Sequence, residues 1–485
     1  MRMTLPFLLL SLNLNLFTDT SPQASRYPAD KLKPCRVPDV EEEVLCGRYE
    51  VYENRAARTG RKIGLNIVVL PAKTADVAPD PLVFLAGGGV APATRYARYL
   101  SRAFPNLRLR RDILLIDQRG SGGSNGLECE LPTDPINAEY RDEARFLEAV
   151  RRCRKELERK ADLRYYTTPI AMDDLDEVRG WLGYPKLNLY GVSYGTKAAV
   201  VYLRQHPERV RTMVMHGVVP LDVPMWLEFP RSSQQALDQA FAACARQPGC
   251  RQAFPKVAQE FSALLQRLAE KPVKVKVSKA EAGQEVEIPI DAEVLRGYVA
   301  SALFSAERIH DLPLLIHLAY EGDYQPLARR VAFRGESGIP KGVYLSIVCS
   351  EQMPQFDAGA LPAAAAGTFI GGFRLQREVS ACGEWVRGWL PQGFWQPVKS
   401  DVPALILSGA LDHATPPRYG EHLAGSLARS RHLVLPNRGH NDTDPCVSGM
   451  IEAFVQAASV DGLDTSCLAK TEDLSFALRR EELMN

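Results

Sequence analysis

Near the middle of the 485-residue chain stands the stretch Leu187-Asn188-Leu189-Tyr190-Gly191-Val192-Ser193-Tyr194-Gly195. Its first four residues predict a short buried strand, and the residues from Thr196 to Gln205 predict a helix. Between them lies a G-x-S-x-G pattern, which holds a serine at a strained strand-to-helix turn. Glycine is needed beside the serine because a Cβ there would collide with neighbouring backbone. The stretch predicts that Ser193 is a nucleophile, with an ordinary turn as the alternative.

Other short apolar runs occur on both sides of this stretch, and turn residues bound each of them. Helical stretches separate most of the runs, which is typical of a mostly parallel, doubly wound α/β sheet with helices on both faces. Two alternating segments near the start predict antiparallel strands that enter the sheet. The expected buried strands are 82–85, 113–116, 187–190, 212–215, 404–407 and 432–435, and the expected entry strands are 48–53 and 62–70.

A serine hydroxyl needs a histidine base and a carboxylate that holds the histidine in the correct tautomer. Asp412 follows the predicted strand 404–407, and His440 follows the next predicted strand through a Gly-containing turn. The order serine, acid, histidine is that of the α/β-hydrolase fold. The chain has eight histidines, and six of the others lie in predicted helices, at a strand start or before the acid. The seventh, His413, adjoins Asp412 in the acid loop and is interpreted as a packing or hydrogen-bonding neighbour. We therefore expect Ser193, Asp412 and His440 to form a catalytic triad.

Acyl transfer also needs hydrogen-bond donors for the oxyanion that develops in the transition state. The backbone N–H of Tyr194, directly after the nucleophile, is the first expected donor. The second is expected from Gly88, with Gly89 as the next choice, in the glycine run after strand 82–85. Asp117 and Arg119, which follow the strand 113–116, are interpreted as a charged pair that braces a loop beside the site.

The interval from Pro220 to Ser400 separates two predicted sheet strands and is long enough to form a domain. It contains predicted helices and a predicted hairpin across 273–290. We interpret it as a cap over the active site, with an independent partner-binding domain as the alternative. The expected organisation is a signal peptide (1–24), a first core part (25–219), the cap (220–400) and a second core part with a cysteine-bearing C-terminal region (401–485).

Composition and charge exclude some classes of protein. The chain is 46% hydrophobic and 24% charged, with a formal net charge of +1 and no long basic run, so no nucleic-acid partner is expected. Residues 1–24 have the form of a secretory signal peptide, and nothing later is long and apolar enough for a membrane span. We expect an exported protein, periplasmic or secreted, without a span in its mature form.

Ten cysteines behind an export signal indicate disulfides rather than thiol chemistry or a metal site. The close ligand pairs of a metal site are missing from the sequence, and no phosphate-binding pattern is present, so no metal or cofactor is expected. Spacing does not fix the connectivity, but the cysteines fall into sequential couples. The expected pairs are Cys35–Cys46, Cys129–Cys153, Cys244–Cys250, Cys349–Cys382 and Cys446–Cys467.

Several of these segments resemble the secreted tripeptidyl aminopeptidases, α/β-hydrolases that are relatives of the prolyl aminopeptidases. The resemblance extends along most of the mature chain. It includes Asp117 to Gly122, Gly191 to Thr196, the helix that starts at Leu312 and the acid loop Leu411 to Pro417. It departs at the oxyanion loop, where prolyl aminopeptidases have His-Gly-Gly-Pro-Gly and this chain has Ala-Gly-Gly-Gly-Val at 86–90.

The resemblance implies release of residues or short peptides from free N-termini, with the cap binding the substrate's amine. Glu351, beside Cys349, is the candidate amine ligand, and a structural salt bridge is the alternative role for it. A carboxylesterase of the same fold would use the same triad, and a catalytically inactive binding protein is the third hypothesis. The expected partner is a peptide or small acyl substrate. The sequence does not predict the oligomeric state.

Overall fold

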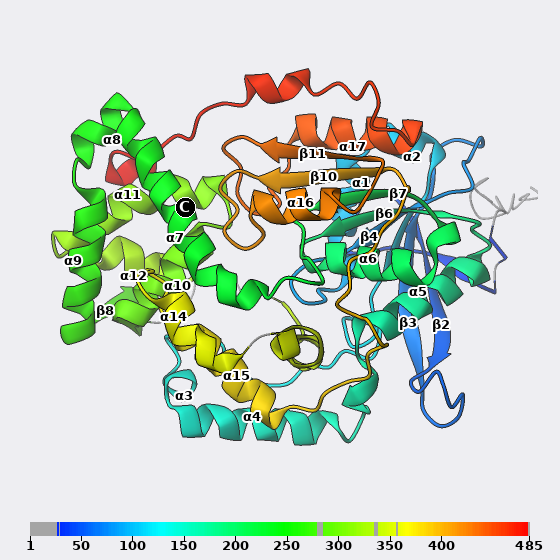
Figure 1. Cartoon of the computed structure of the whole chain (residues 1–485), viewed down its shortest axis with the longest axis horizontal. Helices are drawn as coiled ribbons and strands as arrows, with labels where there is room; N and C mark the ends of the chain where they lie inside the picture. Colours follow the sequence, from blue (N-terminus) through cyan, green and yellow to red (C-terminus); the bar gives the residue numbers. More distant parts are fainter. Residues whose placement is uncertain (1–26, 29, 279–284, 334–337, 356, 484–485) are drawn as a thin grey trace, which may run out of the picture.

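The computed structural model describes residues 27–483, apart from residue 29 and the segments 279–284, 334–337 and 356. The predicted signal peptide lies outside the described residues. A nine-stranded sheet forms the centre of the molecule (Figure 1). In the order in which they pair, its strands are β1 (Leu32–Cys35), β2 (Val44–Tyr52), β3 (Lys62–Leu70), β5 (Ile113–Ile116), β4 (Leu82–Leu85), β6 (Leu187–Val192), β7 (Val210–His216), β10 (Ala404–Gly409) and β11 (Ser430–Leu435).

The sheet is antiparallel from β1 to β5 and parallel from β5 to β11. This confirms the predicted α/β-hydrolase fold with its antiparallel entry. Register brings the functional strand ends together, because Leu85 pairs with Gly191 while His216 pairs with both Val192 and Leu407. The carboxyl ends of β4, β6, β7 and β10 therefore lie side by side.

Helices cover both faces of the sheet, and each face has its own apolar cluster. Side chains of α5, α6 and α16 pack on one face, while those of α1, α2 and α17 pack on the other. The helices outside the insert are α1 (Ala97–Ala103), α2 (Leu107–Arg110), α3 (Ala138–Arg141), α4 (Glu143–Leu157), α5 (Thr168–Leu182), α6 (Tyr194–Gln205), α16 (Pro417–Ala424) and α17 (Pro445–Ala457).

The segment between β7 and β10 is mainly helical and supplies most of a third apolar cluster. It lies beside the sheet in Figure 1, where α7 to α15 run from green to yellow. We call residues 220–400 the insert. Its elements are α7 (Met225–Arg246), α8 (Pro248–Ala253), α9 (Val257–Glu270), the hairpin β8 (Val273–Ser278) and β9 (Glu285–Ile290), α10 (Ala292–Ala302), α11 (Ala306–Tyr320), α12 (Gln325–Ala332), α13 (Lys341–Ile347), a π-helical turn (Val348–Gln352), α14 (Leu361–Ala365) and α15 (Phe373–Glu384).

Two helices of the insert each contain a proline inside them. Pro230 lies within α7 and Pro313 within α11. A proline removes a helical hydrogen bond, so it usually marks a helix end. In α7 the hydroxyls of Ser232 and Ser233 donate to the carbonyls of Glu228 and Phe229, which provides hydrogen bonds beside the proline.

All five predicted disulfides form, which confirms the pairing of sequential cysteine couples. Four of them join neighbouring elements within a short stretch of chain. The Cys349–Cys382 bridge joins the π-helical turn to α15, two parts of the insert that border the site described below. Among the residues that the structure describes, no helix has the length and apolar composition that a membrane span needs.

Candidate active site

Ser193 lies at the turn between β6 and α6, where the chain changes direction sharply. Its backbone adopts φ 55° and ψ −122°, a left-handed conformation that non-glycine residues rarely occupy. Such strain persists only where the surrounding structure enforces it, and it is concentrated at functional sites. The N–H of Ser193 donates to the carbonyl of His216, and its own carbonyl accepts from the backbone and hydroxyl of Thr196. The turn therefore holds the serine at the carboxyl end of β6.

The glycines around Ser193 are required by close backbone approaches. A Cβ at Gly195 would lie 1.8 Å from the carbonyl oxygen of Leu85, and one at Gly191 would lie 2.5 Å from the carbonyl oxygen of Gly195. A Cβ at Gly87 would lie 2.9 Å from the Ser193 Cβ. The glycine loop after β4 thus packs directly against the nucleophile.

Asp412 and His440 come from the loops after β10 and β11, and the structure brings them together. His440 Nδ1 lies 2.8 Å from Asp412 Oδ2, while Asp412 Oδ1 accepts hydrogen bonds from the backbone N–H groups of Ala414 and Thr415. Burial alone would raise the pKa of Asp412, but the charge and hydrogen bond of His440 and the hydrogen bonds of Thr415 hold it well below its usual range. Asp412 is therefore an ionised acceptor that orients the imidazole.

The loop that carries His440 lies near the turn that carries Ser193, at the carboxyl end of β7. A Cβ at Gly217 would lie 3.3 Å from His440 Cε1, and the preceding residue, His216, accepts the hydrogen bond from Ser193 N–H. Within the described part of the chain, no direct hydrogen bond joins the Ser193 hydroxyl to His440. Catalytic hydrogen bonds commonly tighten only when substrate binds.

The two expected oxyanion donors lie on either side of Ser193. Tyr194 begins α6, so its N–H is one of those that have no partner within the helix. Gly88 and Gly89 both have positive φ, 70° and 68°, in the loop that packs on the nucleophile. Val90 continues this conformation with φ 80°, which is costly for a β-branched residue. The sequence analysis did not identify this strained position.

Glu351 is fully engaged with protein partners in this structure. Its carboxylate lies 2.8 Å from the Lys197 ammonium, and both side chains are buried. It also accepts from the N–H and hydroxyl of Thr168 at the start of α5. These contacts correspond to the structural alternative from the sequence analysis, and they leave the carboxylate inaccessible to a substrate amine.

Asp117 and Arg119 are both buried, but they do not form the pair with each other that was expected. Arg119 instead binds Asp174 of α5, with distances of 2.6 and 2.8 Å. Asp117 accepts hydrogen bonds from Asn66 and Thr94. The expectation was wrong because Asp117 and Arg119 each bind residues of other segments that are far away in sequence. The role in bracing the loops remains a prediction.

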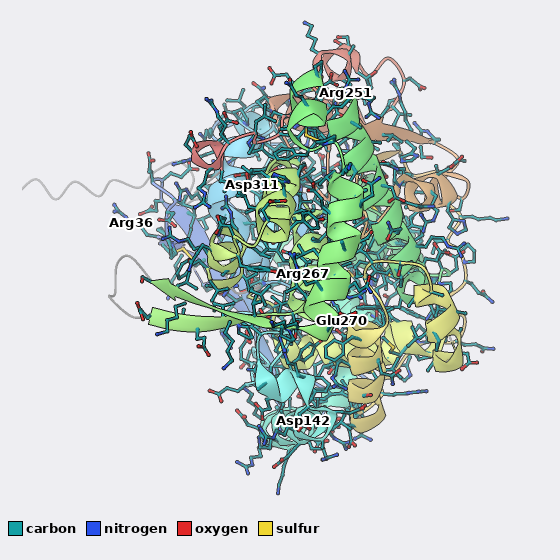
Figure 2. The ribbon with its side chains drawn as sticks, turned by 90° about the vertical axis from the view of Figure 1, so that its left-hand side faces the viewer. Arg36, Asp142, Arg251, Arg267, Glu270 and Asp311 are labelled. Atoms are coloured by element: carbon teal, nitrogen blue, oxygen red, sulfur yellow. A yellow bond between two sulfur atoms is a disulfide. The ribbon has the colours of Figure 1, made fainter. Side chains whose placement is uncertain are left out.

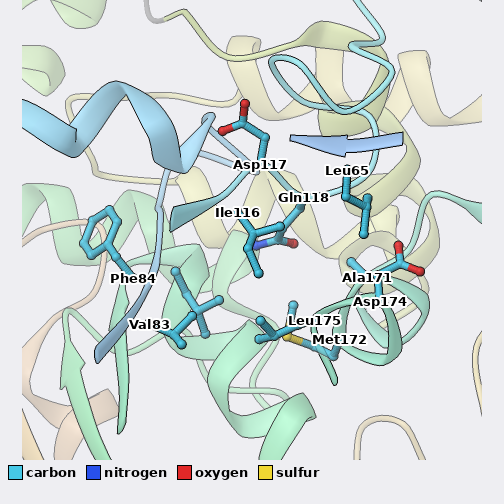
Figure 3. A pocket seen from close by; sticks show the side chains of 11 residues that line it. Leu65, Val83, Phe84, Ile116, Asp117, Gln118, Ala171, Met172, Asp174 and Leu175 are labelled. Carbon is cyan, nitrogen blue, oxygen red and sulfur yellow. The ribbon is translucent and has the colours of Figure 1, made fainter. Parts of the chain in front are cut away.

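A small cavity lies between the sheet and α5, near these residues (Figure 3). Asp117, Gln118 and Asp174 lie at its border, and the remaining lining is mainly apolar. Its volume of about 10 Å³ is close to the minimum for a single water molecule. It is therefore too small for a substrate, and the loop edge around Ser193 remains the candidate site.

Two further histidines lie near the triad, and neither fits the role of base. Burial, with a smaller contribution from His440, lowers the pKa of His216 to about 4. Burial also lowers the pKa of His413 to about 3. The ring of His413 packs between Phe229 and Phe304 of the insert, at centroid distances of 5.4 and 4.5 Å. Both histidines are neutral packing residues near neutral pH.

Two residues that contact Asp412 or His440 were missed by the sequence analysis. Thr415 Oγ1 lies 2.5 Å from Asp412 Oδ2 and 3.0 Å from His440 Nδ1, so its hydroxyl contacts both. Phe304 of the insert accepts the backbone hydrogen bond of His440 at 2.8 Å and packs edge to face on its ring. The Asp-x-x-Thr spacing was a usable signal for Thr415, whereas nothing in the sequence placed Phe304 beside His440.

Fold and site together define a serine hydrolase of the α/β-hydrolase superfamily. The family described as "alpha/beta hydrolase fold" matches residues 80–286, and the family described as "TAP-like protein" matches residues 367–467. The chain is 25% identical to the tripeptidyl aminopeptidase of Streptomyces coelicolor, over 87% of this chain and 83% of that protein. The chain is an α/β-hydrolase that has tripeptidyl aminopeptidases among its homologues, which also include named serine peptidases.

Two shorter sequence matches are to named peptidases, and the chain also has a remote likeness to a solved structure. The serine protease Hip1 of Mycobacterium tuberculosis is 29% identical over 45% of each chain. The proline iminopeptidase of Neisseria gonorrhoeae is 30% identical over 29% of this chain and 34% of its own. A solved proline iminopeptidase-related protein from Thermus thermophilus is 17% identical, covering 86% of this chain and 98% of its own, with a TM-score of 0.39.

Proposed function

We propose that this serine peptidase is an exported aminopeptidase that releases residues or short peptides from free N-termini through an acyl-enzyme on Ser193. The observation that carries the proposal is the convergence of a strained serine, an Asp412–His440 pair at 2.8 Å and a glycine loop at adjacent strand ends. The relative named tripeptidyl aminopeptidase, which matches 87% of the chain, supports the substrate class.

In the proposed mechanism, Ser193 Oγ attacks the scissile carbonyl while its proton passes to the free ring nitrogen of His440. Asp412 binds the other ring nitrogen and stabilises the imidazolium that forms. The backbone N–H groups of Gly88 and Tyr194 donate to the oxyanion. The imidazolium then gives its proton to the leaving amine, and water, deprotonated by His440, hydrolyses the acyl-enzyme.

Recognition of a free N-terminus needs a carboxylate that a substrate can reach, and the half-buried Glu378 of α15 fits this role better than the fully buried Glu351. Tyr344 connects it to the site, since a Cβ at Gly89 would lie 2.5 Å from the Tyr344 ring and the Tyr344 hydroxyl donates to Glu378 Oε1 at 3.0 Å. Burial raises the pKa of Glu378 even though Arg374 acts to lower it. A substrate ammonium would stabilise the ionised carboxylate.

The insert is proposed to act as the cap over this site. It contributes Phe304 beside His440, as well as Tyr344 and Ile339 beside the glycine loop. Export is proposed from the signal-like sequence of residues 1–24 and is supported by the five disulfides, which persist in oxidising compartments.

The decisive experiment compares wild type, Ser193→Ala and Glu378→Gln on one substrate panel. The panel holds peptide arylamides with free N-termini, the same peptides acetylated, and short acyl esters. We expect wild type to react with a fluorophosphonate probe and to cleave free peptides about tenfold or more faster than acetylated ones, since a charged hydrogen bond is lost on acetylation. Ser193→Ala should abolish both reactions, and Glu378→Gln should reduce the preference for the free amine.

Absence of probe labelling on folded wild type would reject the serine mechanism. Cleavage of esters alone would favour a carboxylesterase. Equal cleavage of free and acetylated peptides would reject the proposed recognition of the amine. An unchanged preference in Glu378→Gln would reject only the role of that residue.

A further inference from the structure

An accessible guanidinium lies among the residues that border the candidate active site. Arg374 is the second residue of α15, and its side chain is exposed. In the part of the chain that the structure describes, it forms no ion pair. Desolvation by the surrounding protein would lower its pKa, but Tyr344 and Glu378 raise it, so the group stays charged. Because the residue is exposed, a ligand in solution can reach the guanidinium.

Arg374 is connected to both walls of the site. Towards the glycine loop, its neighbour Tyr344 lies against the Cβ position of Gly89. Towards the acid loop, its guanidinium lies 5.9 Å from the ring centroid of Phe229, which in turn packs on His413. His413 directly follows the triad residue Asp412, so Arg374 stands between the oxyanion side and the acid–histidine side.

Arg374 interacts with Tyr344 and with the charge of Glu378, but neither contact is an ion pair among the described residues. Glu378 lies four residues further along α15, on the same face of the helix, a spacing that commonly gives an ion pair. Its carboxylate instead accepts the hydroxyl of Tyr344. The cation–π contact with Phe229 uses the face of the guanidinium and leaves its N–H donors at the edge.

We propose that Arg374 binds a carboxylate of the peptide substrate close to the scissile bond. A guanidinium presents donors in a planar fork that matches a carboxylate. An exposed guanidinium without an ion pair at this place therefore discriminates between charged and neutral substrates. The inference rests on the proposed peptidase function. The carboxylate belongs either to an acidic side chain in the N-terminal part of the substrate or to the C-terminus of a short peptide.

Two matched substrate pairs distinguish these sources. The first pair is a tripeptide arylamide with Glu before the scissile bond and the same compound with Gln. The second is a neutral tetrapeptide with a free C-terminus and its C-terminal amide. For wild type we expect kcat/KM to be higher for the charged member of at least one pair. Arg374→Gln should reduce that ratio about tenfold, which corresponds to the loss of one charge-assisted hydrogen bond.

Arg251→Gln is the matched control. Arg251 is an exposed arginine on α8, which lies far from α15 in both views (Figures 1 and 2). This variant loses the same charge but should keep the wild-type ratios. Arg374→Glu should reverse the sign of the preference. If Arg374 variants fail to fold, the wild-type ratio still tests the proposal, because added salt should reduce it.

Equal kcat/KM within both pairs for wild type would overturn the proposal, as would ratios that Arg374→Gln leaves unchanged. Either result would leave the proposed peptidase function standing, because the neutral peptides lack the carboxylate that Arg374 is proposed to bind. Failure to cleave any peptide, with intact probe labelling, would overturn the proposed function and this inference with it.

Discussion

Asp412 accepts four hydrogen bonds, from the backbone N–H groups of Ala414 and Thr415, the hydroxyl of Thr415 and the ring of His440. These donors hold the carboxylate ionised without exposure to water. The Thr415 hydroxyl also contacts His440 Nδ1, so one short loop sets the position of both residues. The acid loop therefore holds the imidazole of His440 in a single tautomer.

Replacing Asp412 with Asn keeps the size of the side chain and removes its charge. We expect kcat to fall by about four orders of magnitude, because the amide favours the wrong tautomer of His440 and does not stabilise its charged form. Steady-state kinetics on a cleaved peptide measures the loss. Asp444→Asn is the control, since Asp444 caps α17 rather than contacting His440. A kcat near the wild-type value in Asp412→Asn would contradict the assigned role.

The same carboxylate gives a pH-dependent contribution to stability. Because the pKa of Asp412 is lowered on folding, its ionised form stabilises the fold above a pH of about 4, the usual value in an unfolded chain. This contribution is lost as the pH falls towards the folded-state pKa. The difference in free energy of unfolding between wild type and Asp412→Asn should therefore shrink from pH 5 to pH 3 in urea titrations. A constant or growing difference would contradict the lowered pKa.

Strands with alternating or unbroken apolar residues were predictable from the sequence, because a buried face of a sheet requires apolar side chains at those positions. Strands β3, β4 and β5 have the predicted bounds. The edge strand β1 was missed, since it is four residues long and contains Pro34. The loops that bring Asp412 and His440 together followed from strand order. Arg374, Phe304 and Glu378 did not, because their place beside the site depends on how the insert folds over the sheet.

A buried ion pair and a hydrogen bond join three elements, the π-helical turn, α6 and α5. Glu351 in the π-helical turn binds Lys197 of α6 and the first residue of α5, Thr168. Glu351→Gln leaves the buried Lys197 charge without its partner, so we expect a loss of about 3 kcal/mol in the free energy of unfolding. Thermal and urea denaturation should detect it.

Glu384→Gln is the comparison variant, because Glu384 forms an ion pair with the exposed Arg151. A pair of this kind contributes about 0.5 kcal/mol or less. The two variants therefore separate buried from exposed pairing for the same chemical change. If Glu351→Gln kept wild-type stability but raised KM only for free-amine peptides, Glu351 would be a substrate ligand and the structural assignment would be wrong.

At the scale of the whole molecule, the end of the chain returns to the insert rather than ending on the sheet. Leu474, Phe476 and Ala477 are buried in the insert's apolar cluster. The backbone N–H of Ala477 donates to the carbonyl of His310 in α11. In Figure 1 this last segment, drawn in red, crosses from the sheet to the insert. The insert is thus held at both its own ends and by a third segment from the C-terminus.

This arrangement predicts that the C-terminal segment controls the stability of the insert and, through Phe304, the placement of His440. Phe476 is 7% exposed, and Phe476→Ala should lower the local free energy of opening of α11 by about 3 kcal/mol, which hydrogen–deuterium exchange measures. Leu478→Ala is the control, because Leu478 is 37% exposed and its truncation should change protection by about 0.5 kcal/mol or less. Helices α5 and α6 should keep their protection in both variants, since their apolar cluster contains neither residue. Equal exchange of α11 in Phe476→Ala and wild type would show that the insert is stable without this contact, and His440 would then depend on the insert's own fold alone.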